Sequence, residues 1–162
     1  MSKFKSIKKN YFIIPLSVIL VAFLGSSFTS AGMAWYDTLF KPELLPPRWV
    51  FPVAWNIIFV FCTASALILW NHGQTKRRTF IFSLFCVNGI LNVLWCILFF
   101  GFHLILFSFY EIFFLELTNV LLILFSWKYS KWGSVLLLPY FLWVLFAAYL
   151  TYEILTLNIM RL

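Results

Sequence analysis

Polar side chains inside long apolar runs are the residues of this chain whose type and spacing suit ligand binding. Asn88 and Asn92 are four positions apart and Trp95 follows three positions later, so a helix places all three on one face. A buried amide without a partner costs roughly 2 kcal/mol or more in hydrocarbon, so this face is expected to point into a helix bundle. Asn88, Asn92 and Trp95 are therefore candidate ligand-binding residues.

A second inward stripe lies near the C-terminus. Tyr140, Trp143 and Ala147 follow the i, i+3, i+7 pattern of one helix face. Ala147 leaves room beside the Trp143 indole for a ligand or for a closely packed helix. Trp55, Trp95 and Trp143 all lie well inside apolar runs. Helix packing alone explains any one of these indoles, but three on different helices favour a shared cavity.

The acidic and sulfur-containing side chains indicate no catalytic or metal chemistry. Glu111 and Glu116 are five positions apart, which is about 140° around a helix, so we expect at most one of them to face a common site. The three cysteines form no CxxC pair and have no histidine within helical reach, so no metal site is predicted; they are Cys62, Cys86 and Cys96. No Ser/His/Asp or paired-carboxylate arrangement has catalytic spacing.

The composition requires these residues to be positioned within a lipid bilayer. Hydrophobic residues make up 64% of the 162 positions and charged residues 10%, with a mean hydropathy of +0.97, whereas soluble domains carry roughly 25% charged residues. The charge-free runs are long enough to cross a hydrocarbon core, which takes about 20 residues, and they are continuous, unlike β-barrel strands. We therefore predict an all-α integral membrane protein, residues 1–162 forming a single bundle of five transmembrane helices near 12–34, 49–70, 80–100, 106–126 and 134–158.

The distribution of basic residues predicts the orientation. One side is expected to carry Lys3, Lys5, Lys8, Lys9, Lys76, Arg77, Arg78, Lys128 and Lys131, and the other Lys41, Arg48 and Arg161. Lys and Arg near span ends stay in the cytoplasm, so the N-terminus is expected inside and the C-terminus outside a bacterial inner membrane. Anionic lipid headgroups suffice to explain the net charge of +7, and no nucleic-acid partner is expected. A cleaved signal peptide is the alternative for the first helix, because SSFTSAGMA resembles a cleavage region.

The first connection is rich in proline. The segment KPELLPPRWVFPVAW, residues 41–55, holds four of the six prolines and two of the eight tryptophans. Proline fixes φ and removes a backbone donor, so Pro42, Pro46 and Pro47 stiffen this loop. Pro52 falls in the first turn of the next helix, where a missing N–H costs little. We expect a preset lid over one end of the bundle; termination of the flanking helices is the simpler alternative.

Three motifs in order resemble one known family. They are WYDTLFKPELLPPRWVFPVAW, residues 35–55; LNVLWCILFFGFH, residues 91–103; and LLLPYFLWVLFAAYLTYEILTLN, residues 136–158. The second resembles the pattern LNxxWxxLFFGxH of the translocator protein family, also called TspO or tryptophan-rich sensory protein and formerly the peripheral benzodiazepine receptor. The likeness extends from the first helix to Asn158.

The resemblance implies a five-helix bundle, usually a homodimer, that binds tetrapyrroles such as protoporphyrin IX and haem, together with sterols and benzodiazepine-type drugs. It implies a sensor or stress regulator with no obligatory cofactor, whose pocket lies beneath the first loop and is lined by Trp55, Asn92, Trp143 and Ala147. Light-dependent breakdown of protoporphyrin IX, also credited to the family, would fall to Trp55 and Trp143 as indole electron donors.

The full candidate ligand-binding set combines these residues with others near the loop. Lys41 and Arg48 flank the expected lid and are placed to pair with the propionates of a porphyrin, and Trp35 lies at the end of the first span. The set is Trp35, Lys41, Arg48, Trp55, Asn88, Asn92, Trp95, Tyr140, Trp143 and Ala147.

The sequence departs from the family pattern at several positions, and it is also consistent with other functions. Asn56, Phe59 and Thr151 stand where the family usually has Thr, Tyr and Asn, and the C-terminal sterol motif is incomplete. A transporter of amphipathic metabolites is an alternative, although the chain has no inverted repeat. A purely structural bundle is another. Candidate close-packing surfaces for a dimer are Gly25, Thr29, Gly32 and Gly89.

Overall fold

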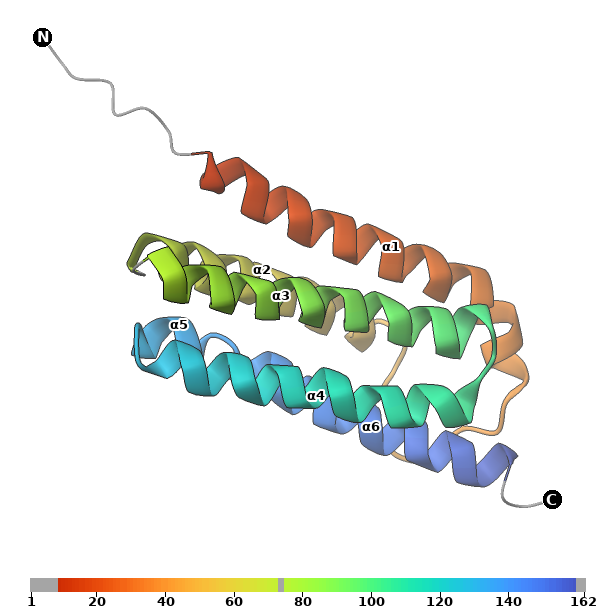
Figure 1. The fold of residues 1–162 in the computed structure, drawn as a ribbon. Helices are drawn as coiled ribbons and strands as arrows, with labels where there is room; N and C mark the ends of the chain where they lie inside the picture. Colours follow the sequence, from red (N-terminus) through yellow and green to blue (C-terminus); the bar gives the residue numbers. More distant parts are fainter. Residues whose placement is uncertain (1–8, 73–74, 160–162) are drawn as a thin grey trace, which may run out of the picture.

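The described part of the chain is entirely helical and contains five helices long and apolar enough to cross a membrane. A computed structural model describes residues 9–72 and 75–159. Its elements are α1 (Asn10–Thr38), α2 (Val50–His72), α3 (Thr75–Cys96), the π-helical segment η1 (Ile97–Gly101), α4 (Ile105–Trp127), α5 (Lys131–Val135) and α6 (Leu138–Asn158), arranged as a bundle (Figure 1).

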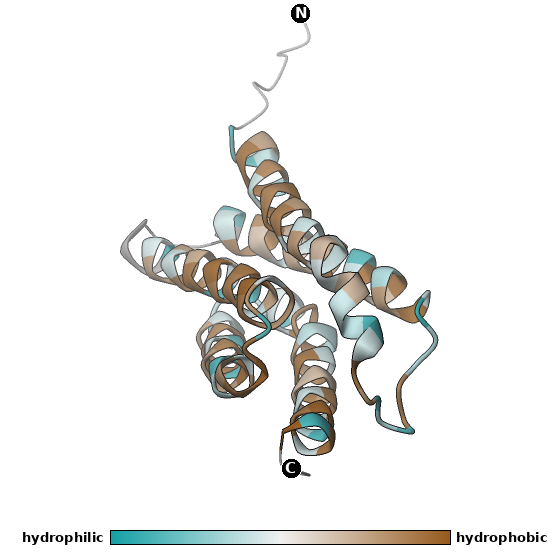
Figure 2. Cartoon of the chain, turned by 90° about the vertical axis from the view of Figure 1, so that its right-hand side faces the viewer, coloured by the Kyte–Doolittle hydropathy of each residue, from teal (hydrophilic) through white to brown (hydrophobic). Residues whose placement is uncertain are grey.

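Large apolar side chains cover the outside of this bundle. Leu16, Phe23 and Ile90 are each about two-thirds exposed, at 68%, 66% and 67%, and brown apolar residues run along the helices in the end-on view of Figure 2. Such a surface is incompatible with water, whereas helices satisfy their own backbone hydrogen bonds in lipid. The predicted class, an all-helical multi-pass membrane protein, is confirmed.

The helices do not pack equally closely. α4 lies against both α3 and α6, and α1 lies against α2, α3 and η1, whereas α2 meets α6 at fewer points. Buried residues from α2, α4 and α6 nevertheless form one central cluster, which consists of Ile58, Ile112, Leu115, Tyr140 and Val144. The looser contact between α2 and α6 is therefore bridged by side chains, and the candidate site is built there.

Two helix boundaries differ from the prediction for identifiable reasons. The last span, expected as one helix over 134–158, is divided into α5 and α6 by a turn at Leu136 and Leu137. Pro139, in the first turn of α6, has no N–H to donate to the preceding turn, so a continuous helix would lack this bond. α3 begins at Thr75, so residues 76–78, which lie between the predicted spans 49–70 and 80–100, belong to a helix.

The end of α3 widens into a π-helical turn that touches α1. The N–H of Phe102 donates to the carbonyl of Ile97, five residues earlier, at 2.8 Å. A Cβ on Gly32 of α1 would lie only 2.2 Å from the carbonyl oxygen of Phe100, so α1 can approach η1 this closely only because residue 32 is glycine. Gly25 and Gly89 likewise face Cys96 and Val21 across the contact between α1 and α3. These glycines pack within one chain.

Candidate functional site

Three helices bring an indole, an amide and a phenol together in the central cluster. The ring centroids of Trp55 on α2 and Tyr140 on α6 are 6.0 Å apart, with an interplanar angle of 64°. The amide nitrogen of Asn92 on α3 donates a hydrogen bond of 3.2 Å to the hydroxyl oxygen of Tyr140. The inward face predicted from helical spacing therefore meets the stripe of the last helix directly.

A second aromatic contact lies one turn along from the first. Phe51 is four residues before Trp55 on α2, and its ring centroid lies 5.8 Å from that of Trp143, which is three residues after Tyr140 on α6. Ala147, a further turn along α6, packs against the same central cluster. We call Phe51, Trp55, Asn92, Tyr140, Trp143 and Ala147 the aromatic site.

Burial within the aromatic site is uneven. Tyr140 and Asn92 are only 5% and 6% exposed, whereas Trp55 and Trp143 are half-buried. The hydrogen-bonded pair of Asn92 and Tyr140 is therefore buried, whereas the two indoles retain surface that the chain does not cover. Aromatic walls with a few placed polar groups are suited to a broad apolar ring.

Asn88 lies apart from the aromatic site. Its amide nitrogen donates to Thr118 Oγ1 and to Asn119 Oδ1 on α4, both at 2.8 Å. The amide of Asn119 in turn donates to Glu116 Oε2 at 2.9 Å. This buried network joins α3 to α4, so the arrangement supports a packing role for Asn88, the simpler explanation of a buried amide.

Two further predicted tryptophans belong to a neighbouring aromatic cluster. The Trp95 ring stacks on Phe99, with centroids 5.1 Å apart, and the ring of Trp35 meets the edge of Phe99 at 5.6 Å. Trp35 also stacks on the exposed imidazole of His103 at 4.1 Å. Trp95 packs against the central cluster as well, so it borders the aromatic site, whereas Trp35 lies on the α1 side of Phe99.

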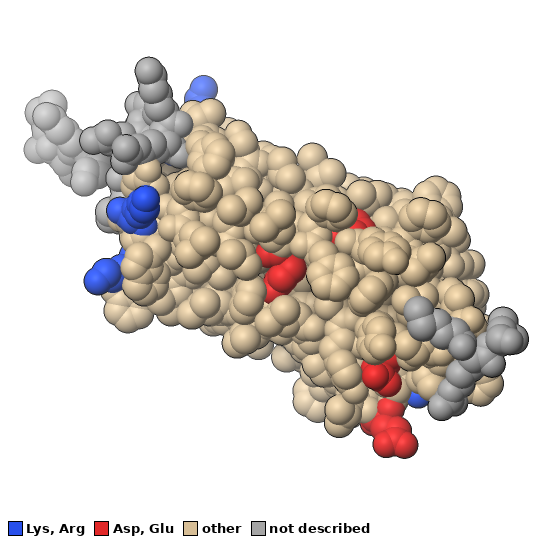
Figure 3. Space-filling model, turned by 60° about the horizontal axis from the view of Figure 1, so that its bottom comes forward, with Lys and Arg blue, Asp and Glu red and all other residues tan. Residues whose placement is uncertain are grey.

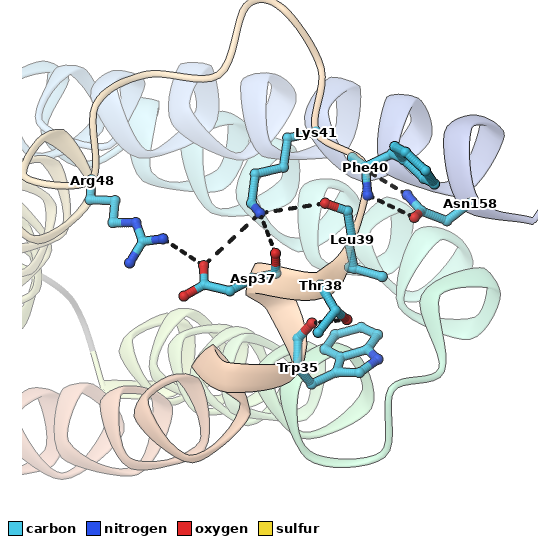
Figure 4. A network of polar contacts seen from close by, with 8 residues as sticks. All are labelled: Trp35, Asp37, Thr38, Leu39, Phe40, Lys41, Arg48 and Asn158. Atoms are coloured by element: carbon cyan, nitrogen blue, oxygen red, sulfur yellow. Dashed lines mark hydrogen bonds and ion pairs between the residues drawn. The ribbon is translucent and has the colours of Figure 1, made fainter.

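The two loop cations are engaged by an acid that the sequence analysis did not single out. An Nη of Arg48 donates to the carboxylate of Asp37 at 2.6 Å, and Nζ of Lys41 lies 4.0 Å from the same oxygen. Figure 4 shows both side chains pointing toward Asp37 at the end of α1. The exposed Asp37 carboxylate therefore engages the two cations that we expect to pair with the propionates of a porphyrin.

The first loop, residues 39–49, is also fastened to the end of α6. The N–H of Phe40 donates to Asn158 Oδ1, and Asn158 Nδ2 donates back to the Phe40 carbonyl, each at 2.9 Å (Figure 4). Asn158, Asp37 and Phe51 were not predicted as site residues. A lone amide at the end of an apolar span was the available signal for Asn158; the other two depend on tertiary contacts.

The two acids of α4 have different surroundings. Glu116 is half-buried and accepts from Asn119, whereas Glu111 is 6% exposed. Neither oxygen of Glu111 has a hydrogen-bond partner within residues 9–72 and 75–159. Across those residues, no three His, Cys, Asp or Glu side chains are grouped so that they could hold a metal ion.

The sequence of this chain matches a known protein family. The model of the TspO/MBR family matches residues 13–157. The chain belongs to the TspO/MBR family. A tryptophan-rich protein TspO of Chlorobaculum tepidum is 39% identical over 142 residues, covering 86% of this chain and 90% of the relative.

Similar relatives also come from an archaeon and an animal. A tryptophan-rich protein TspO of Archaeoglobus fulgidus is 36% identical, covering 88% of this chain and 93% of its own length. A translocator protein of Ovis aries is 30% identical, with 81% and 79% covered. The resemblance drawn from the three sequence motifs is confirmed, and the aromatic site lies within the TspO/MBR match.

Proposed function

We propose that this TspO/MBR protein binds a tetrapyrrole, protoporphyrin IX or haem, against the aromatic site and acts as a membrane sensor or stress regulator. The observation that carries the proposal is the pair of half-buried indoles, Trp55 and Trp143, presented by two helices beside the buried Asn92–Tyr140 hydrogen bond. A flat ring stacks on the indole faces, while its propionates remain near water and the loop cations.

In this proposal the first loop acts as a lid. Its ends are held by Asn158 on α6 and by the Arg48–Asp37 ion pair. A propionate that reaches Arg48 or Lys41 competes with Asp37 for the same cation, so binding of an anionic ligand is coupled to rearrangement of the loop. Neutralising Asp37 as Asp37→Asn frees both cations and is expected to tighten the binding of dicarboxylic porphyrins.

Titration of the purified protein with protoporphyrin IX and with haem tests the proposal. We expect a saturable shift of the Soret band, and about tenfold weaker binding after Trp55→Ala or Trp143→Ala, a loss of about 1.4 kcal/mol. Trp132→Ala is the matched control, because Trp132 is 77% exposed and lies outside the site. Equal affinities for all three variants, or no saturable shift at micromolar ligand, would exclude the aromatic site.

Light-dependent degradation of bound protoporphyrin IX is a second candidate activity. It is favoured by the placement of two indoles where an excited ring would contact them, since an indole can donate an electron to an excited ring. The conservative variants Trp55→Phe and Trp143→Phe retain apolar contact but remove the electron donors. We expect them to bind pigment and to bleach it more slowly under illumination; bleaching at the native rate would rule out indole chemistry.

We also propose that the N-terminus lies in the cytoplasm of a bacterium and that the protein is a homodimer. In Figure 3 the blue side chains gather mainly at one end of the molecule, where α1 begins and where Arg78, Lys128 and Lys131 lie; Lys41 and Arg48 belong to the loop at the other end. The positive-inside rule favours this orientation. The predicted glycine contacts are used within the chain, so a dimer would be built from exposed apolar helix faces.

A further inference from the structure

One end of the bundle carries Arg78, Lys128 and Lys131 without any acidic side chain, and we call it the basic end. The five acids of the chain lie beside or within the first loop, inside α4 and near the end of α6; they are Asp37, Glu43, Glu111, Glu116 and Glu153. On the face drawn in Figure 3, the blue side chains that gather at this end have no red side chain beside them. Side-chain carboxylates therefore do not neutralise these cations, whereas Arg48 at the other end is paired with an acid.

Two cations of the basic end lie against indole rings instead. The guanidinium carbon of Arg78 on α3 is 4.5 Å from the ring centroid of Trp70 on α2. Nζ of Lys131, at the start of α5, is 6.0 Å from the ring centroid of Trp127, at the end of α4. We call these contacts the cation–indole pairs. A ring face attracts a cation electrostatically, so each indole positions its cation without supplying the negative charge that would neutralise it.

Contacts between four elements hold the two cation–indole pairs at the same end of the bundle. The rings of Phe80 and Phe125, whose centroids are 5.0 Å apart, join α3 to α4 two residues from a member of each pair. A Cβ on Gly133 of α5 would lie 3.1 Å from Cγ of Leu69, the residue before Trp70 on α2. One buried cluster joins α2, α3, α4 and α6 next to these contacts. The pairs are therefore fixed to a packed part of the bundle.

The cation–indole pairs lie where the apolar surface of the bundle ends. Phe80 and Phe125 are exposed within one turn of them, and the exposed indoles of Trp127 and Trp132 lie beside Lys131. Indoles favour the headgroup region of a bilayer, and Arg and Lys side chains near span ends extend toward the phosphates. The anions present at this depth belong to lipid molecules, which favours a lipid over a dissolved ion as the partner.

The chemistry of the cations selects the type of headgroup. A guanidinium binds phosphate oxygens through two parallel hydrogen bonds, and an ammonium binds them as a point charge. A zwitterionic headgroup brings its own cation, which competes for the phosphate, whereas phosphatidylglycerol carries none. We propose that the Arg78–Trp70 and Lys131–Trp127 pairs bind the phosphodiester headgroups of anionic phospholipids in the leaflet at the basic end.

Competition between two lipids tests this proposal. The purified full-length chain in detergent is mixed with equal amounts of phosphatidylglycerol and phosphatidylcholine that have identical acyl chains, and native mass spectrometry measures the two lipid-bound forms. We expect the phosphatidylglycerol complex to be about three- to tenfold more abundant, because one basic residue near anionic lipid contributes roughly a fivefold effect. Glycerol 3-phosphate at millimolar concentration is added in a second arm, and we expect it not to displace the lipid.

Matched variants locate the binding site. Arg78→Gln and Lys131→Gln are each expected to lower the preference for phosphatidylglycerol by about half or more. Lys128→Gln is the control, because it removes the same charge from an exposed residue at the same end that belongs to neither cation–indole pair. Trp70→Leu keeps every charge and is expected to lower the preference as well. The thermal unfolding midpoint with phosphatidylcholine alone separates lost binding from lost folding; if Trp70→Leu does not fold, the glutamine variants decide.

Each outcome supports or overturns the proposal. A preference that falls in Arg78→Gln and Lys131→Gln but persists in Lys128→Gln supports it. Equal binding of both lipids by the native chain overturns it, and so does an equal loss in all three glutamine variants, which would show a diffuse effect of charge. Displacement of the lipid by glycerol 3-phosphate would assign the cations to a soluble phosphate compound instead. No step uses a porphyrin, so the result is independent of the tetrapyrrole function proposed above.

Discussion

At the scale of single residues, Gly32 has the least room for change among the glycines of α1. Its missing side chain lets α1 contact the backbone of η1, and a methyl group there would overlap the Phe100 carbonyl oxygen at 2.2 Å. Backbone atoms cannot move aside as the end of a flexible side chain can. Alanine at this position must therefore push α1 away from the rest of the bundle.

We expect Gly32→Ala to lower the free energy of unfolding by about 1–3 kcal/mol, the usual cost of overpacking. The measurement is the thermal unfolding midpoint in detergent micelles, followed by circular dichroism. Gly25→Ala on the same helix is the control, because its Cβ would make an ordinary 3.5 Å contact with Cys96 Sγ. The same midpoint for both variants would contradict the close approach of α1 to η1.

Much of the aromatic site could be predicted from residue types, because a polar or large aromatic side chain inside a membrane span has few favourable environments. That argument assigned Asn92, Tyr140 and Trp143 to inward helix faces, and in the structure these residues lie close together. It could not distinguish Asn92 from Asn88, which lies on the same helix face, because the choice between α6 and α4 as partner depends on tertiary packing. Asp37 was missed for the same reason.

At the scale of the elements, the first loop is held near each of its two ends by contacts with a helix. Asn158 bonds both backbone groups of Phe40, and Asp37 pairs with Arg48 eleven residues later. Prolines stiffen the loop, but these contacts fix its position against the bundle. Hydropathy and proline content predicted a stiff connection; they carried no information about its attachment to α6.

We expect Asn158→Ala to release the loop from α6. The loss of two hydrogen bonds should increase the rate of tryptic cleavage after Arg48 about three- to tenfold, because exposed bonds contribute roughly 0.5–1.5 kcal/mol each at most. The readout is the fragment pattern on a gel over time. Asn56→Ala is the control, since the Asn56 amide donates to the carbonyl of Pro52 on its own helix. Indistinguishable cleavage of the two variants would show that Asn158 does not hold the loop.

At the scale of the whole molecule, the apolar surface and the five long helices follow directly from composition, since no other backbone arrangement satisfies continuous apolar runs in lipid. The positions of the spans were therefore predictable. The turn before Pro139 and the π-helical turn at η1 were not located, because apolar residues run through both of them, over 135–138 and 97–100. Orientation depends on charge asymmetry and is tested separately.

Labelling of cysteines introduced one at a time, in intact bacterial cells, tests the orientation. A membrane-impermeant maleimide should label Glu43→Cys in the first loop without permeabilisation, and Lys131→Cys at the start of α5 only after it, because the basic end is expected in the cytoplasm. The native chain, which contains Cys62, Cys86 and Cys96 within its helices, measures the background. The reverse labelling pattern would place the N-terminus outside.

A helical wheel does not give the correct directions of the side chains that follow the start of the π-helical turn. Because η1 holds one extra residue in its turn, side chains beyond Ile97 are rotated by about 100° relative to a wheel started at Asn88. Phe99 and Phe100 consequently both reach the ring of Tyr36 on α1. Deleting one residue from this turn would leave the hydropathy profile almost unchanged, yet it would swing these phenylalanines away from their partner, so this stretch has little tolerance for a change in length.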